Sequence, residues 1–221
     1  QAHRQYALLL REWARMKVEA AQSQDDQKAK LLEKAASLYE EAHKASVQSV
    51  EALRERLRAL KGASAGEQRQ DTDQRDRLRG EYLLALLGAA ESLEEKAATQ
   101  PADSPARRSL LQRAIEKYDE IFQKYGGYLA GLQARFYQAR CLTKLGDEET
   151  ALEYLTKDLF PQIDDRPAAR QLKTKAMLLA MECWMDESRA DYAKVIGQGQ
   201  PWLKTIRPAE EEQPNWLLLR L

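Results

Sequence analysis

The segment LQARFYQARCLTKLGDEETALEYLTKDL, residues 132–159, decides the fold of this chain. It predicts two helices rich in alanine and leucine, over 129–145 and 147–159. Gly146 ends the first helix, because glycine tolerates the left-handed backbone that often follows a helix, and Asp147 caps the second. Almost no loop remains between the two helices, so they must run antiparallel as a hairpin.

The composition extends this helical prediction to the whole chain. Its 221 residues include 33 Ala and 32 Leu, whereas Val, Ile and Thr together number 16. Strands draw on β-branched residues, so this ratio predicts an all-α protein. The charge balance of 35 Lys and Arg against 35 Asp and Glu argues against a nucleic-acid partner. No stretch approaches the ~20 apolar residues of a membrane span, so we expect no membrane insertion of this segment.

The first helix is expected over residues 2–22. All seven prolines lie at or after Pro101, so nothing in the first hundred residues breaks a long helix. Apolar side chains are expected along one broad face of this first helix: Tyr6, Leu9, Leu10, Trp13 and Val18.

Two further long helices are expected over 25–61 and 73–98, with a polar loop at about 62–72 between them. Asp25 or Asp26 can cap the first of these. Their apolar residues are spaced to face one another, so the pair predicts a long antiparallel hairpin. Residues 1–99 are therefore expected to form an N-terminal helical region.

Shorter helical hairpins are expected over 100–200. Ser104-Pro105 opens a helix as an N-cap followed by proline at the first helical position, and Gly126-Gly127 ends it. After the hairpin of the opening segment, a last one is expected over 168–187 and 189–197.

The final segment, 201–221, is expected to start a further helix. Its end, Trp216 to Leu221, is strongly apolar, and a stack of helices does not end on an uncovered apolar face. We therefore expect the natural chain to continue past Leu221, or this segment to pack in a homodimer.

A repeated pair of positions recurs in the second helix of successive hairpins. A small alanine is followed four residues later by a larger side chain, so that a neighbouring helix can approach the alanine closely. The pairs are Ala35 and Tyr39, Ala114 and Tyr118, and Ala151 and Leu155, with a poorer anchor at Ala190.

The pattern resembles the tetratricopeptide repeat, a helix-turn-helix unit of about 34 residues. The matching positions are Ala139, Leu142, the Gly146-Asp147 turn, Ala151 and Leu155. Arg135 stands where that family often has tryptophan, and Asp158 where it has a small residue. The resemblance implies hairpins stacked as a right-handed superhelix. The connection KYGGYLAGLQA is similar to that of bacterial cell-envelope repeat proteins, which implies an envelope or periplasmic location, with the cytoplasm as the alternative.

In proteins of this family the first helix of each unit lines a concave groove. Residue-by-residue transfer places eight side chains there: Gln133, Phe136, Arg140, Lys144, Leu172, Lys175, Leu179 and Glu182. Cations among apolar residues suit a peptide with acidic side chains. The alternative is that Phe136 and Leu179 simply pack in the core.

The sequence offers no clear set of catalytic, cofactor-binding or metal-binding residues. Glu40 and His43 form one Glu-x-x-His pair, whereas di-iron bundles need that pair twice. Cys141 and Cys183 lie in apolar helical segments, where we expect buried thiols, with a disulfide as the alternative. We therefore expect a non-enzymatic scaffold that binds another protein on a concave helical-repeat surface. The alternative is a structural bundle or coiled-coil adaptor that self-associates through helices 25–61 and 73–98.

Overall fold

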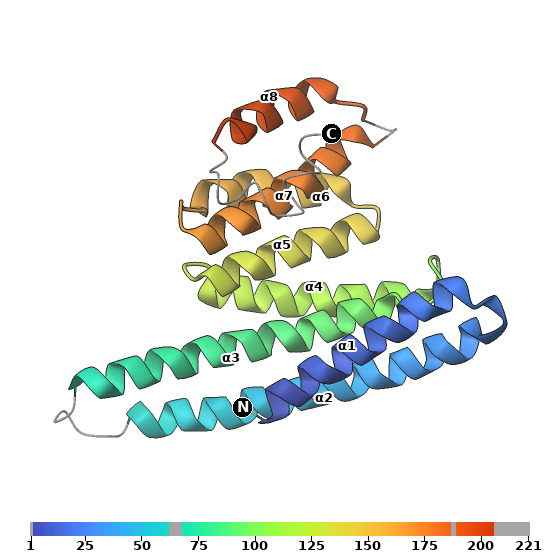
Figure 1. Ribbon diagram of the computed structural model, residues 1–221. Coiled ribbons are helices and arrows are strands. Elements are labelled where there is room, and N and C mark those ends of the chain that lie inside the picture. The colour runs from blue at the N-terminus through green and yellow to red at the C-terminus, as the bar shows by residue number, and fades with distance from the viewer. Residues whose placement is uncertain (1, 62–67, 187–188, 206–221) are drawn as a thin grey trace. The chain divides into compact units, whose positions relative to one another are not determined.

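A computed structural model describes residues 2–61, 68–186 and 189–205 of the chain (Figure 1). Every regular element in these residues is a helix or a helical turn, which confirms the predicted all-α class. None of the helices in this part combines the length and apolar character needed to cross a membrane. The α-helices are α1 (Ala2–Ser23), α2 (Lys28–Lys61), α3 (Gln68–Ala97), α4 (Pro105–Tyr125), α5 (Leu129–Lys144), α6 (Glu148–Glu153), α7 (Pro167–Met185) and α8 (Tyr192–Leu203).

The chain divides into two compact units, Gln1–Ile121 and Phe122–Leu221. The boundary between the units falls inside α4, about twenty residues beyond the expected boundary at residue 99. The first four turns of α4 therefore belong to the first unit. Its last turn belongs to the second.

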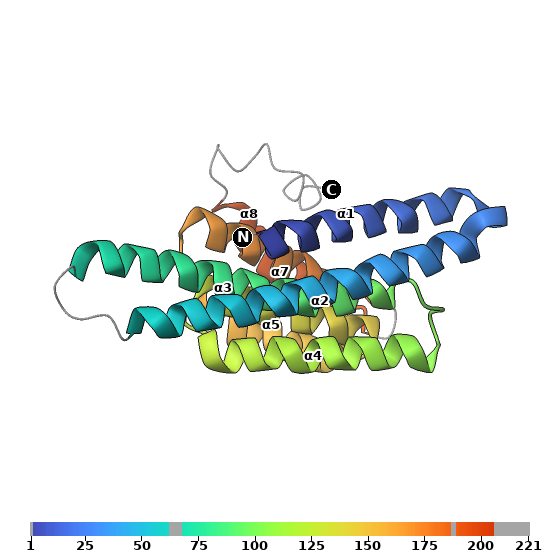
Figure 2. The ribbon, with the colours of Figure 1, turned by 90° about the horizontal axis from the view of Figure 1, so that it is seen from below.

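In the first unit, α1, α2 and α3 pack side by side, with α1 along one side of the α2–α3 hairpin (Figure 2). This confirms the predicted packing of the two long helices. Alanines with no exposed surface let the helices approach closely, and larger apolar side chains fill the space between them. One such core cluster joins α1 to α2 and contains Leu10, Ala14, Ala35, Leu38, Tyr39 and Ala42.

A group of ion pairs links α1 to α3. Arg11 is almost fully buried, with Nη1 2.5 Å from Glu91 Oε2 and Nε 2.8 Å from Glu95 Oε2. Arg15 Nη2 lies 2.8 Å from the other oxygen of Glu95. Burial on its own would lower the pKa of Arg11. The hydrogen bond to Glu95 and the charges of both carboxylates outweigh burial and raise this pKa, so the guanidinium stays charged.

Helix α4 begins as the sequence predicts. Ser104 Oγ accepts a 3.1 Å hydrogen bond from the Arg107 N–H, which satisfies one of the free donors of the first turn. Farther along, the Tyr118 hydroxyl donates a 2.9 Å hydrogen bond to Glu94 Oε2 of α3, and both side chains are buried. The repeated pair Ala114 and Tyr118 is thus part of the core of the first unit.

The second unit contains the predicted tight hairpin between α5 and α6. Gly146 has a φ of +82°, the left-handed backbone that favours glycine. Asp147 caps α6, with its side chain accepting a 3.1 Å hydrogen bond from the Thr150 N–H. The pair Ala151 and Leu155 has no exposed surface, as the packing argument predicts.

Arg135 and Asp158, the two departures from the repeat pattern, lie against each other. Arg135 Nη2 is 2.7 Å from Asp158 Oδ2. The guanidinium is stacked between two rings, 4.0 Å from the ring centre of Phe122 and 3.9 Å from that of Tyr154. A flat cation between two aromatic faces takes the place of an aromatic side chain, and the carboxylate balances its charge.

Several expected boundaries in the chain were wrong. Helix α3 begins at Gln68, so residues 68–72 are helical rather than loop, while residues 62–67 lie outside the described part. Asp25 and Asp26 lie in a 3-10 turn before α2, so this helix begins at Lys28 rather than at about residue 25. Beyond Glu153 the chain continues as a π-helical turn, Tyr154–Leu159.

The last hairpin also differs from the expectation of 189–197 for its second helix. Ala190 has a φ of 46° and precedes α8, so this poorer anchor is not in a helix. Helix α8 includes both Gly197 and Gly199. Gly199 is buried against α7, where a Cβ would overlap the terminal methyl of Met181. Residues 206–221, with most of the expected further helix, lie outside the described part.

Candidate peptide-binding cleft

A cleft of about 630 Å³ opens within the second unit, between α6 with its π-helical turn and the α7–α8 hairpin. Its lining mixes charged side chains of both signs with a few apolar ones. The lining residues are Glu149, Leu152, Glu153, Thr156, Lys157, Phe160, Trp184, Arg189, Lys194 and Gln198.

One wall of the cleft follows from the sequence of α6 and the π-helical turn. Glu149, Glu153 and Lys157 are spaced four residues apart, which puts them along one side of the helix. Lys157 Nζ lies 2.8 Å from Glu153 Oε1, and this bond and charge raise the pKa of Lys157. The wider π-helical turn is also a feature frequently found at functional sites.

The opposite wall is held by the start of α8. The Asp191 side chain accepts hydrogen bonds from the Lys194 N–H at 3.2 Å and from Lys194 Nζ at 3.0 Å, which lower the pKa of Asp191. The Asp191 N–H in turn donates a 2.8 Å hydrogen bond to the Trp184 carbonyl at the end of α7. These bonds fix Lys194 and Trp184 on their side of the cleft.

The lining therefore combines apolar side chains with charges of both signs. Leu152 and Trp184 are buried, and Phe160 is half-buried. Glu149 and Glu153 come from one wall, while Arg189 and Lys194 come from the other. Such a lining suits an extended segment that carries both acidic and basic side chains.

None of the eight residues predicted to bind a partner lines this cleft. Phe136, Leu172 and Leu179 are buried, as the packing alternative expects. The other five keep some exposure: Gln133, Arg140, Lys144, Lys175 and Glu182. Arg140 lies over the rings of its own helix, 4.5 Å from the ring centre of Tyr137. The structure thus brings the predicted residues onto α5 and α7 but leaves only the polar ones accessible.

The sequence carries a signal for the cleft that the prediction missed. The spacing of Glu149, Glu153 and Lys157 indicates a charged side of a helix. Trp184 is a large aromatic residue near the end of the apolar segment 176–185. What the sequence does not show is that α8 lies opposite α6.

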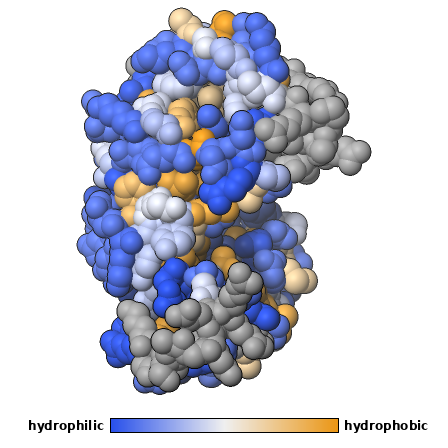
Figure 3. Space-filling model, turned by 90° about the vertical axis from the view of Figure 1, so that its left-hand side faces the viewer, coloured by the Kyte–Doolittle hydropathy of each residue, from blue (hydrophilic) through white to orange (hydrophobic). Residues whose placement is uncertain are grey.

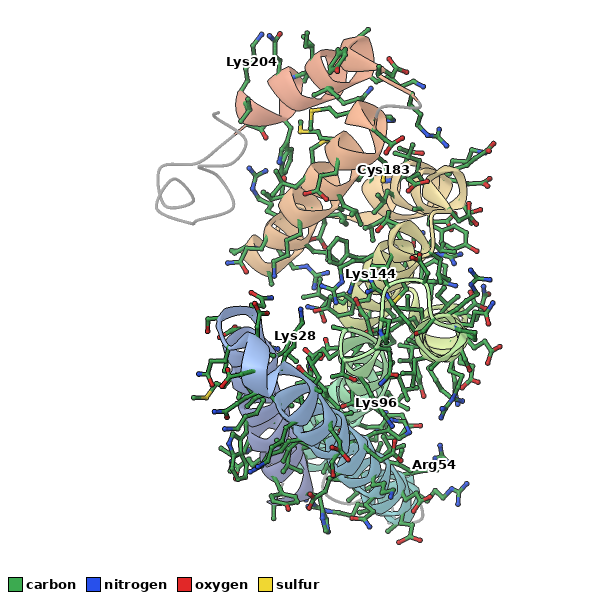
Figure 4. The ribbon with its side chains drawn as sticks, turned by 90° about the vertical axis from the view of Figure 1, so that its right-hand side faces the viewer. Lys28, Arg54, Lys96, Lys144, Cys183 and Lys204 are labelled. Atoms are coloured by element: carbon green, nitrogen blue, oxygen red, sulfur yellow. The ribbon has the colours of Figure 1, made fainter. Side chains whose placement is uncertain are left out.

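Within the described residues, no group of three or more His, Cys, Asp and Glu is placed to hold a metal ion. His43 Nδ1 lies 2.9 Å from the Ala89 carbonyl oxygen, where it joins α2 to α3. Both cysteines are buried free thiols, so the disulfide alternative is wrong. Figure 4 labels one of them, Cys183, which lies in α7.

Cys183 is poorly suited to act as a nucleophile. Burial, followed by the nearby carboxylates of Glu148 and Glu182, raises the pKa of this thiol to about 11 from a usual value of 9.0. A thiol with a raised pKa stays protonated as the pH rises through its usual value and ionises only near the higher one.

We expect the Cys183 thiol of the native protein to resist alkylation by iodoacetamide at pH 8. The shift reduces the thiolate fraction about 100-fold, and burial restricts access as well. Mass spectrometry of the labelled peptide over time measures the rate, with urea-unfolded protein as the control. The rate should keep rising above pH 9 instead of levelling off there. Fast labelling of Cys183 in the folded chain would contradict this assignment.

Comparisons of the chain with protein-family models, with curated proteins and with solved structures found no match.

Proposed function

We propose that this chain is a non-enzymatic interaction protein whose second unit binds an extended peptide segment of another protein. The observation that supports this most is the cleft itself, whose lining combines charges of both signs with apolar side chains. Its volume of about 630 Å³ suits a few peptide side chains. The mechanism is complementarity of shape and charge, without turnover or cofactor.

The peptide class follows from the two walls. Basic side chains of the peptide would lie towards Glu149 and Glu153, and acidic ones towards Arg189 and Lys194. Gln198 offers both a donor and acceptor for the peptide backbone. We therefore propose a ligand with neighbouring basic and acidic residues flanking an apolar one.

A stacked, tetratricopeptide-like arrangement of the hairpins is part of the same proposal. It is supported by the α5–α6 hairpin, with its Gly146-Asp147 turn and its fully buried Ala139 and Ala151. The Arg135–Asp158 ion pair accounts for both departures from that pattern. The accessible polar residues of α5 and α7 are the alternative contact surface for this partner, should the cleft not be its site.

Peptide display against the full chain, followed by affinity measurements on the enriched peptides, tests the cleft. The decisive variant is Glu153→Lys with Lys157→Glu, which keeps the ion pair between α6 and the π-helical turn but reverses the charge pattern facing the ligand. We expect it to weaken binding at least about 10-fold, since charge complementarity sets specificity.

The matched control is Arg140→Glu with Lys144→Glu, which changes two charges on α5 instead. We expect this control to leave the affinity for the cleft ligand within about twofold. Absence of any enriched peptide, or equal losses in both double variants, would overturn the cleft as the binding site. A loss confined to the α5 variant would move the site to the α5 and α7 surface.

A further inference from the structure

Helix α1 carries two apolar faces, where the sequence predicted one broad face. Leu10 is buried towards α2, while Val18 packs on the edge of the same core cluster. Tyr6, Leu9 and Trp13 instead point outward and keep much of their surface exposed. We define the outer stripe as the residues that share this second face: Ala2, Tyr6, Leu9, Trp13, Met16 and Ala20.

The outer stripe exposes more large apolar side chains than the described parts of α2 and α3 do. Leu9 and Met16 are 65% and 63% exposed, and Tyr6 and Trp13 are each 46% exposed. By contrast, the described parts of α2 and α3 each expose one large apolar side chain, Val47 and Leu84. Most of the surface seen in Figure 3 is hydrophilic, with apolar side chains in patches. An aligned row of large apolar groups on one helix therefore needs an explanation.

The spacing of the outer stripe is that of a coiled-coil seam. Its members follow one another by four, three, four, three and four residues, which is an unbroken heptad pattern over 2–20. Tyr6, Trp13 and Ala20 take the a positions, and Ala2, Leu9 and Met16 the d positions. A helix with this pattern buries its seam against another helix of the same kind.

The two flanks of the outer stripe carry opposite charges. One flank, the g positions, holds Gln5, Glu12 and Glu19. The other holds Lys17 and, from α2, Lys34, whose Nζ lies 5.8 Å from the ring centre of Trp13. The stripe is thus bordered by acidic groups on one side and, near Trp13 and Lys17, by basic groups on the other.

Farther along the second flank, Glu41 of α2 accepts a 2.5 Å hydrogen bond from the Tyr6 hydroxyl. In a parallel pair this level faces Gln5 of the other chain. That side chain is neutral and can donate a hydrogen bond. No like charges therefore meet at this end of the seam.

We infer that the outer stripe binds the outer stripe of a second copy of this chain, as a parallel two-stranded coiled coil. In a parallel pair, the g flank of one helix faces the e flank of the other, which sets Glu12 against Lys17 and Lys34 of the second copy. An antiparallel pair would bring the two acidic flanks together and the two basic flanks together, which is unfavourable. Charge complementarity therefore selects both the occupant and its direction.

Helix α1 is already folded in the single chain, and this favours its pairing with α1 of a second copy. Packing against α2 and the ion pairs of Arg11 and Arg15 with α3 already hold α1 in place. Association therefore orders only surface side chains, so that even a short seam can contribute net affinity. This inference is independent of the peptide cleft in the second unit.

The first test is the mass of the full chain in solution, measured by light scattering and sedimentation from about 1 to about 500 µM. We expect a concentration-dependent rise from 25.3 kDa towards twice that mass. Leu9→Glu with Met16→Glu should raise the dimer dissociation constant at least about 100-fold, because four charged groups enter the seam. The matched control is Leu8→Glu, which alters an exposed leucine of the same helix outside the stripe.

A second variant keeps the apolar seam intact. Glu12→Lys changes only an exposed side chain, and it sets a lysine against Lys17 and Lys34 of the second copy. We expect about a 10-fold weaker dimer at low salt, recovering as salt screens the repulsion. The direction is tested by Leu9→Cys, which should form an interchain disulfide, whereas Leu8→Cys and the wild-type chain with its buried thiols should not.

Each result decides the inference. A monomer at every concentration, or a dimer that survives Leu9→Glu with Met16→Glu, would overturn it. A dimer that depends on the stripe but gives no disulfide in the Leu9→Cys chain would overturn the parallel arrangement.

Discussion

Replacing Gly131 by alanine is expected to lower the free energy of unfolding of the second unit by about 3–4 kcal/mol. Gly131 is buried in the first turn of α5, directly over the end of α4. A Cβ there would overlap the carbonyl group of Tyr125 and lie 2.8 Å from the Gly126 Cα. These are backbone atoms, so no side chain can rotate away to make room.

The surrounding hydrogen bonds prevent an easy shift of the backbone. The Tyr125 carbonyl accepts a 2.9 Å hydrogen bond from the Tyr128 N–H, and the Gly131 N–H donates a 2.9 Å hydrogen bond to the Tyr128 carbonyl. Moving Tyr125 away from residue 131 would lengthen the first of these bonds. The clash therefore disturbs the whole connection between α4 and α5.

Gly127, four residues earlier, is the matched control. Nothing lies within 4 Å of a Cβ built on it, and its φ is outside the left-handed region. Alanine at this position is expected to change stability by less than about 1 kcal/mol, with a small gain from the restricted unfolded chain. Urea denaturation followed by circular dichroism compares the variants, and hydrogen exchange locates the loss in the second unit. Equal stability of the two alanine variants would show that the approach of α4 and α5 is not this close.

The importance of Gly131 illustrates what sequence alone predicts and what it does not. The cap at Ser104 and the turn at Gly146-Asp147 were predicted correctly because their causes are local. Gly131 gave no such signal, since its role depends on backbone atoms of a different helix. The π-helical turn at Tyr154–Leu159 was likewise not predicted, because a standard helical pattern does not distinguish it from an α-helix.

The candidate site was harder to predict than the fold for the same reason. Phe136, Leu172 and Leu179 occupy positions that line a groove in the resembled family, but here they are buried. The periodicity of the sequence shows which apolar side chains share one face of a helix. It does not show whether another helix covers that face. The outer stripe of α1 shows the converse, because an apolar row that reads as core in the sequence is exposed in the structure.

The second large effect is expected at Arg135. Replacement by methionine keeps much of the side-chain volume but removes the charge and the flat stacking group between Phe122 and Tyr154. It also leaves Asp158 without the guanidinium 2.7 Å away. We expect the free energy of unfolding to fall by about 3 kcal/mol. This is at the low end of the range for breaking a buried ion pair, because the Asp158 side chain is partly exposed. Arg140→Met is the control, with an expected loss below about 1 kcal/mol, since Arg140 lies half-buried over Tyr137.

A double-mutant cycle separates the ion pair from the stacking. Arg135→Trp restores the aromatic side chain of the resembled pattern, and Asp158→Ala restores its small residue. Each single change leaves one charge of the pair behind in a poorly solvated position, whereas the double change removes both charges and retains a ring between Phe122 and Tyr154. We therefore expect the double variant to be at least about 1 kcal/mol more stable than the sum of the single losses predicts. Urea denaturation of the four chains measures this coupling. Losses that add within about 0.5 kcal/mol would mean that Arg135 and Asp158 act separately, and that their pairing does not explain why both depart from the repeat pattern.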